Sequence, residues 1–212
     1  MSSPYLDFLT SIPELGRIDA EKAASFAEIL YRENEKQNLT RILGPRDFYF
    51  GHLLDVLKLF DFAKTFTLGS RVADLGSGCG VPGLLAALLD ADLDRRWLLI
   101  ESEIQKAEYL KRAAIELGLS NVDVIHGRIE ATLSSLRPTT LLARALGDVE
   151  RIASWAWQCS TWNNLVLFKG PSWKSEWELA QKSRFGKKLT LANTFEYSAD
   201  GRARSLVSLQ RK

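Results

Sequence analysis

The stretch 72–83, Val-Ala-Asp-Leu-Gly-Ser-Gly-Cys-Gly-Val-Pro-Gly, constrains the fold more than any other part of the chain. It leaves one apolar run, turns on closely spaced glycines and enters a second apolar run. Gly76, Gly78 and Gly80 let the backbone turn tightly and let a ligand approach without a Cβ in the way. Pro82 suits the first turn of a helix, where its missing N–H costs nothing. The pattern therefore predicts a strand, a ligand-binding loop and a helix.

Beyond residue 70, short apolar runs alternate with stretches that are typical of helices. One such stretch, Glu103–Leu117, is followed by Gly118, a residue that often ends a helix. Continuous apolar strands that alternate with helices are typical of a parallel sheet covered on both faces. The runs expected to form this sheet are Val72–Leu75, Trp97–Ile100, Val122–Ile125, Thr140–Ala143 and Leu165–Phe168.

The N-terminal part of the chain has a helical pattern. Asp19 is expected to cap a helix whose apolar positions recur at 3.6-residue spacing, and Asn38-Leu39-Thr40 is expected to end it. Gly44-Pro45 is expected to start another helix. We therefore predict a helical extension over residues 1–66 and an α/β domain over residues 67–212, together forming one compact unit.

The chain ends in two runs typical of strands, Leu189–Tyr197 and Ala203–Gln210. Asp200-Gly201 lies between them, and this dipeptide favours a tight hairpin turn, so the two strands are expected to be antiparallel. The predicted fold class is α/β, with a mostly parallel, Rossmann-like sheet, a C-terminal antiparallel hairpin and the helical N-terminal extension.

The charge is unevenly distributed along the sequence. Residues 1–168 carry 18 basic and 22 acidic side chains, whereas residues 169–212 carry 10 basic and 4 acidic ones. Such an excess is consistent with a basic surface that meets a polyanion, although it also fits an ordinary solvated surface. The candidate phosphate contacts in the C-terminal part are Lys182, Arg184, Lys187, Lys188, Arg202 and Arg204.

Composition favours a globular protein without a membrane segment or a structural metal. No apolar run approaches the roughly 18 residues of a membrane span, and the first residues lack the pattern of a secretory signal. Two cysteines are too few for a disulfide framework or a four-cysteine zinc site. We expect a cytoplasmic protein with no metal and no membrane partner; the sequence predicts no oligomeric state.

Two classes of ligand fit the glycine loop. Gly78–Gly83 matches the G-x-G-x-x-G fingerprint of dinucleotide-binding loops, but Asp74 would repel a pyrophosphate and attract a cation. S-adenosylmethionine carries a sulfonium and an ammonium, so it suits a carboxylate at this position. Glu101 closes the next strand and could accept both ribose hydroxyl protons of either ligand, or cap the next helix. The C-terminal hairpin, typical of class I methyltransferases, favours S-adenosylmethionine.

The sequence also limits the methyl acceptor. Carbon methylation of a pyrimidine usually needs a cysteine nucleophile, but Cys159 is expected in the core and Cys79 lies within the glycine loop. Methylation of an exocyclic amine commonly uses an Asn/Asp-Pro-Pro-aromatic sequence, and here Leu142-Ala143-Arg144-Ala145 stands in its place. Acceptors that already own a free lone pair, such as guanine N7, need alignment rather than a general base.

Five motifs occur in a specific order along the chain: Asn38-Leu39-Thr40, His52-Leu53-Leu54-Asp55, Asp74–Gly83, Ala143-Arg144-Ala145 and Lys169-Gly170. Together they resemble one known family, the small-subunit (16S) ribosomal RNA guanine-N7 methyltransferase G family, also called glucose-inhibited division protein B. The resemblance implies a class I methyltransferase fold, S-adenosylmethionine as methyl donor, and N7 of one guanine as acceptor. It also implies ribosomal RNA or the small ribosomal subunit as partner.

The resemblance also implies site residues. It places cofactor contacts on Gly76, Val81, the pair Ile129 and Glu130, and Arg144. Arg144 and Lys169 end the fourth and fifth strands and are the candidate catalytic residues: Arg144 to clamp the cofactor carboxylate or an RNA phosphate, Lys169 to contact a phosphate or orient the base. The complete predicted cofactor site is Asp74, Gly76, Gly78, Val81, Glu101, Ile129, Glu130 and Arg144.

Some positions depart from the family pattern or allow two interpretations. Val56 and Ala143 replace serines that the family usually has, which puts local hydrogen bonding in doubt. His52 and Asp55 lie three residues apart on one helix face, so they line a base pocket or, as we favour, join the N-terminal helices to the sheet. Five tryptophans are more often core residues than base-stacking ones, namely Trp155, Trp157, Trp162, Trp173 and Trp177.

Three other functions stay open on the sequence alone. The chain could methylate a small molecule or a protein, in which case the basic C-terminal part would lack RNA affinity. It could be an NAD(P)-dependent oxidoreductase, against which Asp74 counts. It could also be a cofactor-binding RNA module without turnover.

Overall fold

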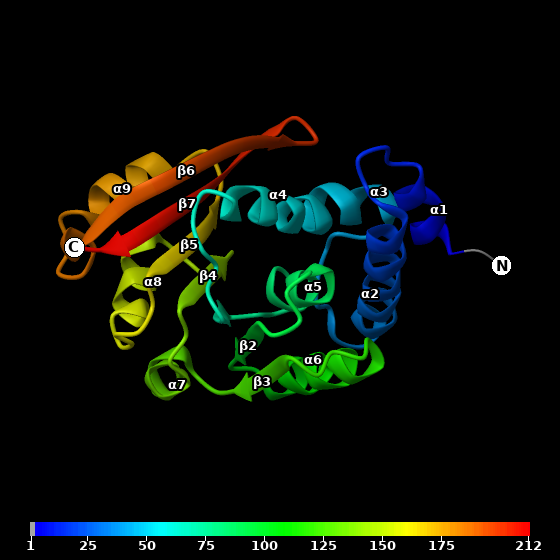
Figure 1. Ribbon diagram of the computed structural model, residues 1–212, viewed down its shortest axis with the longest axis horizontal. Helices are drawn as coiled ribbons and strands as arrows, with labels where there is room; N and C mark the ends of the chain where they lie inside the picture. Colours follow the sequence, from blue (N-terminus) through cyan, green and yellow to red (C-terminus); the bar gives the residue numbers. More distant parts are fainter. Residues whose placement is uncertain (1–2) are drawn as a thin grey trace.

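The computed structural model describes residues 3–212 and contains a seven-stranded sheet in the order β3-β2-β1-β4-β5-β7-β6 (Figure 1). Strands β1 to β5 run parallel to one another, and β7 is antiparallel to both of its neighbours, β5 and β6. The strands are β1 (Arg71–Leu75), β2 (Arg96–Glu101), β3 (Val122–His126), β4 (Thr140–Arg144), β5 (Asn164–Lys169), β6 (Leu189–Ala199) and β7 (Arg202–Arg211). The predicted α/β fold with a terminal hairpin is confirmed.

The strand order reverses between β1 and β4, which are neighbours in the sheet although β2 and β3 lie between them in the chain. Sheets of this kind bind ligands outside the carboxyl ends of the strands near such a reversal. At this edge the chain presents the glycine loop after β1 and the residues that end β2, β4 and β5. The hairpin β6–β7 pairs with β5 and extends the sheet beside them.

Helices cover both faces of the sheet, as Figure 1 shows. The first face carries the N-terminal helices with α5 and α6, and the second carries α7, α8 and α9. The helices are α1 (Pro4–Thr10), α2 (Arg17–Gln37), α3 (Pro45–Phe48), the π-helical segment η1 (Tyr49–Leu53), α4 (Leu54–Ala63), α5 (Gly83–Leu89), α6 (Ile104–Glu116), α7 (Ile129–Leu136), α8 (Val149–Ala156), α9 (Trp173–Ala180) and the short 3-10 helix η2 (Gly186–Lys188).

The N-terminal helices agree with the sequence except at one start. α2 begins at Arg17 with Gly16 as its N-cap, so the expected cap at Asp19 is wrong; Asp19 lies inside the first turn, where a carboxylate favours the helix dipole. Asn38 ends this helix with φ of +48°, and Gly44-Pro45 starts the next, both as expected.

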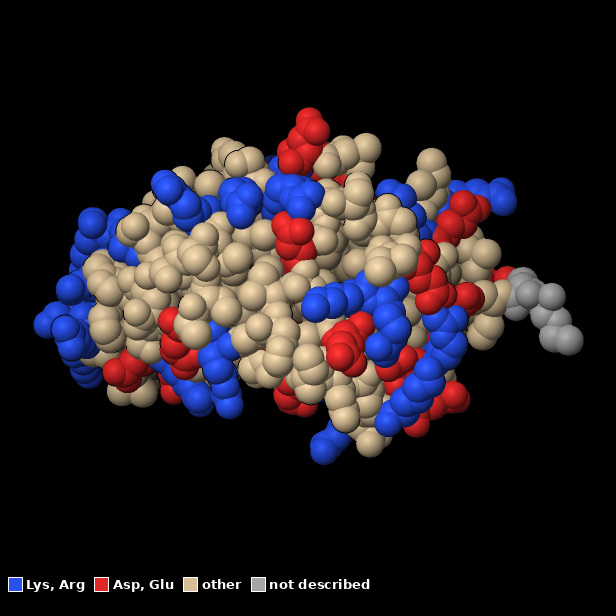
Figure 2. Space-filling view, turned by 90° about the horizontal axis from the view of Figure 1, so that it is seen from below, with Lys and Arg blue, Asp and Glu red and all other residues tan. Residues whose placement is uncertain are grey.

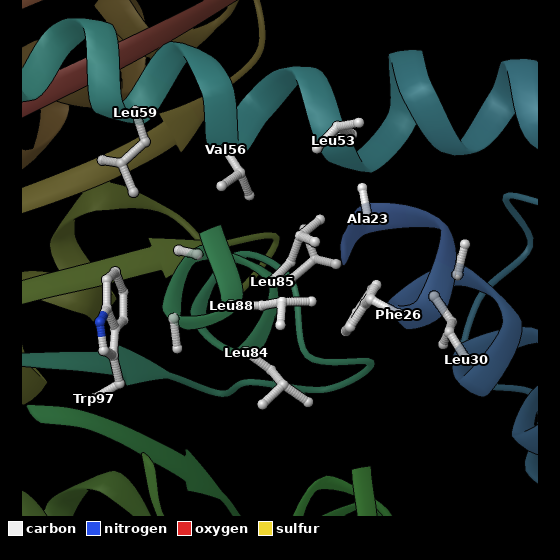
Figure 3. Packing of buried hydrophobic residues seen from close by; sticks show 14 of the residues in the cluster. Ala23, Phe26, Leu30, Leu53, Val56, Leu59, Leu84, Leu85, Leu88 and Trp97 are labelled. Atoms are coloured by element: carbon white, nitrogen blue, oxygen red, sulfur yellow. The ribbon is translucent and has the colours of Figure 1, made fainter. Parts of the chain in front are cut away.

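A single hydrophobic cluster joins the N-terminal helices to the sheet (Figure 3). Phe26 of α2, Val56 of α4, Leu84 of α5 and Trp97 of β2 are each completely buried in it. Truncating one such large side chain to alanine typically costs about 2–5 kcal/mol. The cluster packs the N-terminal helices against the sheet; that residues 1–66 and 67–212 form one compact unit stays a prediction.

Alternate residues of the strands point to the opposite face and form a second cluster. Leu75, Ile100 and Leu167 pack there with Trp162 and Trp177. Within residues 3–212, no helix is both long enough and apolar enough to cross a membrane.

Candidate active site

The glycine loop between β1 and α5 has the geometry expected of a ligand-binding turn. Gly76, Gly78 and Gly80 adopt φ of +70°, +53° and +90°, values that other residues rarely adopt. The N–H of Gly76 donates to the carbonyl of Ile100 at 2.9 Å, which ties the loop to the end of β2. A Cβ on Gly76 would lie 2.5 Å from Cδ1 of Leu146, so a larger residue would displace that side chain.

Glu101 holds this loop from the end of β2. Its Oε2 accepts from the N–H of Gly78 at 2.8 Å, and its Oε1 accepts from the N–H of Glu103 at 2.8 Å. The residue is only 6% exposed. A carboxylate has about four acceptor positions, so two remain for ribose hydroxyls. The expected helix cap at Glu101 is wrong, because the N-cap of α6 is Glu103, whose N–H Glu101 accepts; the ligand contact stays a prediction.

Asp74 lies beneath the loop rather than on its surface. Its Oδ2 accepts from the N–H of Gly83 at 3.0 Å, while the buried Oδ1 has no partner among the described residues. Burial raises the pKa of Asp74 to about 7, although the hydrogen bond from the Gly83 N–H lowers it. An unpartnered buried carboxylate oxygen under a glycine loop fits a ligand that carries positive charge or N–H donors.

A small pocket of about 200 Å³ opens beside the glycine loop. Ile129 and Glu130, at the start of α7, line it together with Trp155 of α8. The Nε1–H of Trp155 donates to Oε1 of Glu130 at 2.6 Å, and the guanidinium of Arg151 lies 4.9 Å from the centre of the indole. We call this the glycine-loop pocket; its lining is Gly76, Ile100, Ser102, Gly127, Arg128, Ile129, Glu130, Leu146, Arg151 and Trp155.

Val81 is placed differently from the other predicted contacts. Its side chain is 6% exposed and belongs to the cluster that packs the N-terminal helices against the sheet. A ligand at the loop would therefore meet the backbone of Val81 rather than its side chain.

Arg144, at the end of β4, uses three of its five N–H donors on residues of the N-terminal helices. Its Nε donates to Oδ2 of Asp55 at 2.9 Å, and its Nη2 donates to the carbonyl of Gly51. Its Nη1 lies 3.2 Å from Nδ1 of His52. The guanidinium therefore joins β4 to η1 and α4, and the clamp expected from the sequence would have to use its two remaining N–H groups, one on each Nη.

His52 connects this arginine to the turn after α2. Burial, followed by the nearby charge of Arg144, lowers the pKa of His52 to about 3, so the ring is neutral. Its Nδ1 then accepts from Arg144, and its Nε2 donates to the hydroxyl of Thr40 at 3.2 Å. Three of the motifs that carry the family resemblance thus form one hydrogen-bonded network.

Asp55 is the centre of that network. Besides Arg144 on Oδ2, its Oδ1 accepts from the hydroxyl of Tyr197 at 2.6 Å and from Nη1 of Arg204 at 2.7 Å. Its side chain is only 3% exposed. Asp55 therefore ties the N-terminal helices to the C-terminal hairpin as well as to β4, which agrees with the structural role favoured for His52 and Asp55.

A larger cavity of about 370 Å³ lies over this network at the ends of β4 and β5. The cavity has two arginines from the hairpin at its rim, of which Arg202 is exposed. We call it the arginine cavity; its lining is Asp55, Arg144, Ala145, Phe168, Lys169, Gly170, Pro171, Tyr197, Arg202, Ala203 and Arg204.

Lys169 lies in the wall of the arginine cavity but its ammonium is already bound. Nζ donates to Oε2 of Glu176 at 2.6 Å and to the carbonyl of Gly147 at 2.7 Å, and the side chain is 8% exposed. It joins the loops after β4 and β5 to α9. The expected contact of Lys169 with a phosphate would require this ion pair to open.

Residues that the sequence left open fall mostly in the core. Val56 and Ala143 are buried and line neither pocket, so the missing serine hydroxyls affect packing rather than the site. Trp162, Trp173 and Trp177 are buried, as expected, and so is Cys159.

The basic residues of the C-terminal part separate into two groups. Arg202 and Arg204 lie at the arginine cavity. The other four candidates precede β6. Its first residue, Leu189, follows η2 and pairs with Arg211 at the end of β7, on the side of the sheet away from both pockets. The sequence predicted all six residues as one phosphate-binding set, but the fold separates them into these two groups.

Three residues have roles at the site that the sequence did not predict. Tyr197 and Thr40 complete the network around Asp55 and His52, and Trp155, expected in the core, lines the glycine-loop pocket and donates to Glu130. Thr40 could have been found because it belongs to a recognised motif. Tyr197 gives no sequence signal, because its role depends on a partner 142 residues away.

The sheet order, the glycine loop and the carboxylate at the end of β2 together define the class I S-adenosylmethionine-dependent methyltransferase fold. Solved structures agree. A mutant of MtNAS in complex with S-adenosylmethionine is 20% identical, with a TM-score of 0.59 over 98% of this chain and 77% of that one. The B. subtilis tRNA methyltransferase TrmK is 16% identical, with a TM-score of 0.55 over 73% of this chain and 65% of that one.

The chain belongs to the rRNA small subunit methyltransferase G (GidB) family, whose model matches residues 19–206. Relatives named ribosomal RNA small subunit methyltransferase G include one from Ruegeria sp. (strain TM1040), 35% identical over 80% of this chain and 82% of its own length. Another, from Solibacter usitatus, is 31% identical over 93% of this chain and 94% of its own length. The resemblance read from the motifs is confirmed, and the methyltransferase interpretation of the glycine loop displaces the oxidoreductase one.

Proposed function

We propose that this protein transfers a methyl group from S-adenosylmethionine to N7 of a guanine in small-subunit ribosomal RNA. Family membership supports the ribosomal RNA and the methyl donor. The observation that carries the choice of N7 is the chemistry of the arginine cavity. Among the described residues that line it, no side chain is free to act as a nucleophile or a general base.

Each candidate group in the cavity is already bound. Both oxygens of Asp55 accept from cations, and the ammonium of Lys169 is paired with Glu176. The pKa of Tyr197 is raised above its ordinary value, mainly by burial and further by the Asp55 carboxylate. The phenol therefore stays protonated. An acceptor that must lose a proton would find no partner here, whereas guanine N7 attacks with its own lone pair.

The two cysteines support the same choice. Cys159 is buried at the far end of the sheet, where Arg211 donates to its carbonyl. Cys79 lies in the glycine loop, and burial raises the pKa of its thiol, which disfavours the reactive thiolate. A covalent mechanism on a pyrimidine carbon is therefore not favoured.

The glycine-loop pocket suits the methyl donor. The residues that would hold it are Glu101 on the ribose, Ile129 and Glu130 beside the adenine, and Asp74 beneath the loop. S-adenosylmethionine supplies an electrophilic methyl group on a sulfonium. The protein contributes alignment: it fixes the glycine loop through Glu101 and Asp74, and it fixes the neighbouring cavity through Arg144.

Arg144 and Lys169 act as positioning residues in this scheme. Arg144 holds Asp55 and His52, so it sets the wall of the cavity in which the guanine would lie. Arg202, at the rim and exposed, is the residue best placed to meet a phosphate next to the target base. We also propose a cytoplasmic location, because an enzyme that modifies ribosomal RNA works where that RNA is found.

The test is transfer of labelled methyl from S-adenosylmethionine to small ribosomal subunits that lack the modification, followed by nucleoside analysis. We expect the label in 7-methylguanosine of the small-subunit RNA and none in the large subunit. Label in another nucleoside would overturn the choice of N7. Label in ribosomal protein, or none in the presence of intact cofactor binding, would overturn ribosomal RNA as the acceptor.

A further inference from the structure

A group of cations lies at the end of the molecule opposite the two pockets. The segment 179–195 contains Lys182, Arg184, Lys187 and Lys188 and no Asp or Glu. Arg211 and Lys212 join them, because the N–H of Lys212 donates to the carbonyl of Lys188. Figure 2 shows basic side chains gathered at the left end of the molecule, where Figure 1 places the C-terminus. We call these six residues the basic end.

The cations of the basic end have no acidic partners. Among residues 3–212, none of the six lies within 4.0 Å of a carboxylate oxygen, whereas Lys169 and Lys174, on the side of the arginine cavity, pair with Glu176 and Glu196. Four of them, Lys182, Arg184, Lys187 and Lys188, are exposed. Their charges are therefore available to a partner from solution.

Aromatic rings lie among these cations. Trp157 and Phe185 are half-buried with ring centres 6.2 Å apart. Nζ of Lys188 lies 4.8 Å from the centre of the Trp157 ring, and the guanidinium of Arg184 lies 5.3 Å from that of Phe185. Arg211 contacts Trp157 from the chain terminus at 4.3 Å. Cations mixed with aromatic rings are typical of surfaces that bind single-stranded or irregular nucleic acid.

The basic end is too far from the arginine cavity to touch the same nucleotide. Arg204, at the cavity, and Arg211, at the basic end, belong to the same strand and are seven residues apart. At about 3.4 Å per residue, the two lie about 24 Å apart. A ligand that reaches both must therefore be long and held in a defined shape.

We propose that the basic end is a second RNA contact, which binds the sugar-phosphate backbone of structured small-subunit RNA about 24 Å from the arginine cavity, the separation of Arg204 and Arg211 along β7. The inference rests on the proposed function for its choice of polyanion. RNA suits this surface better than an acidic protein or a lipid surface, because the cations are spread over a strand end, a turn and the chain terminus. Phosphates spaced along a folded RNA match such a pattern.

The inference predicts a dependence on the length of the substrate. The test variant replaces Lys182, Arg184, Lys187 and Lys188 together by Gln. Its KM for complete small-subunit RNA, or for the subunit, should rise by about tenfold or more, because four phosphate contacts are lost. Its kcat and its affinity for S-adenosylmethionine should not change, since these residues lie away from both pockets. On a short hairpin that carries only the target guanine, variant and wild type should have the same KM.

Salt dependence gives a second readout. Each phosphate contact contributes about 0.7–0.9 to the slope of log affinity against log salt, so the variant should lose about 3 from the slope seen with long RNA. The matched control replaces four cations of the opposite side, Arg17, Arg32, Lys36 and Lys111, by Gln. It changes the net charge equally and should leave KM and slope unchanged.

Several outcomes would overturn the inference: an unchanged KM on long RNA, an equal loss on long and short RNA, or an equal loss in the control variant. Binding of wild type, but not the variant, to vesicles of anionic lipid without a change in RNA binding would assign the surface to membranes instead. Affinity for RNA measured without cofactor separates this inference from the proposed function. If wild type binds long RNA through these residues but transfers no methyl group, only the proposed function fails.

Discussion

The glycine-loop pocket and the arginine cavity lie at the same edge of one sheet, but they differ in how far apart in the sequence their contacting residues are. The glycine-loop pocket is formed mostly by residues 74–155, and its key contacts join neighbouring strand ends, such as Glu101 to Gly78. The arginine cavity depends on Asp55, which binds partners 89, 142 and 149 residues further along the chain.

This difference has a consequence for function. The pocket that we assign to the methyl donor is lined by residues 76–155, which form consecutive strand-loop-helix units. The cavity that we assign to the acceptor is lined by residues of an N-terminal helix, of β4 and β5 and of the C-terminal hairpin, which lie far apart in the sequence. Acceptor specificity is therefore expected to be sensitive to long-range contacts, and donor binding to local ones.

The largest effect is expected for Asp55→Ala. The change leaves Arg144 and Arg204 side by side without their counter-charge, and breaking a buried ion pair typically costs about 3–5 kcal/mol. The free energy of unfolding, measured by chemical denaturation, should fall by about this amount. Asp47→Ala, at an exposed position just before η1, serves as the control. A fall of less than about 1 kcal/mol, the usual value of an exposed pair, would show that the network does not hold the cavity together.

The next largest effect concerns Asp74 and pH. Its pKa of about 7 in the folded chain lies above the ordinary 3.8, so its protonated form stabilises the fold, and this contribution is lost as pH rises through 7. At about 1.4 kcal/mol per pKa unit, the stability of wild type relative to Asp74→Asn should fall by about 2–4 kcal/mol between pH 4 and pH 8. Unfolding curves of both proteins across this range measure the difference. A difference that stays constant with pH would contradict the buried, unpartnered state of Asp74.

Glu101→Gln should weaken the methyl donor without unfolding the protein. The substitution keeps one acceptor oxygen but removes the negative charge of the carboxylate. That carboxylate accepts from the Gly78 N–H and would accept from the ribose hydroxyls. Hydrogen bonds to charged groups contribute about 1.5–3 kcal/mol, so the Kd for S-adenosylmethionine should rise about ten- to a hundredfold. Calorimetric titration measures it, with the KM for RNA as the control for the arginine cavity. Equal losses of donor and RNA affinity would mean that the two pockets do not act separately.

The smallest effect is expected for Trp155→Phe. The variant keeps an aromatic ring in the pocket lining but loses the indole N–H that donates to Glu130. Because the loss is on the order of one neutral hydrogen bond, the Kd for S-adenosylmethionine should change by less than about threefold. Its readout is fluorescence: the change in tryptophan emission on donor binding should disappear, because the other tryptophans lie outside the pocket. An undiminished fluorescence change would remove Trp155 from the donor site.

The sequence predicted the parallel sheet, the hairpin and the glycine loop because each depends on local patterns of apolar, glycine and proline residues. It also located Glu101 and Asp74 at strand ends. It did not predict that Arg144 and Lys169 would be bound by Asp55 and Glu176, since those pairs form only when distant elements pack. Charge composition likewise suggested one basic surface, and only the register of β6 and β7 separates the basic end from Arg202 and Arg204.

The most direct test of the account is single-turnover methyl transfer to small-subunit RNA in which 7-deazaguanosine replaces guanosine, compared with the unsubstituted RNA. Direct attack by N7 predicts that the unsubstituted RNA accepts the methyl group and that the substituted RNA binds but accepts none. Transfer to the 7-deaza RNA at a comparable rate would contradict N7 as the acceptor, and with it the assignment of the arginine cavity to a base that needs no proton removed.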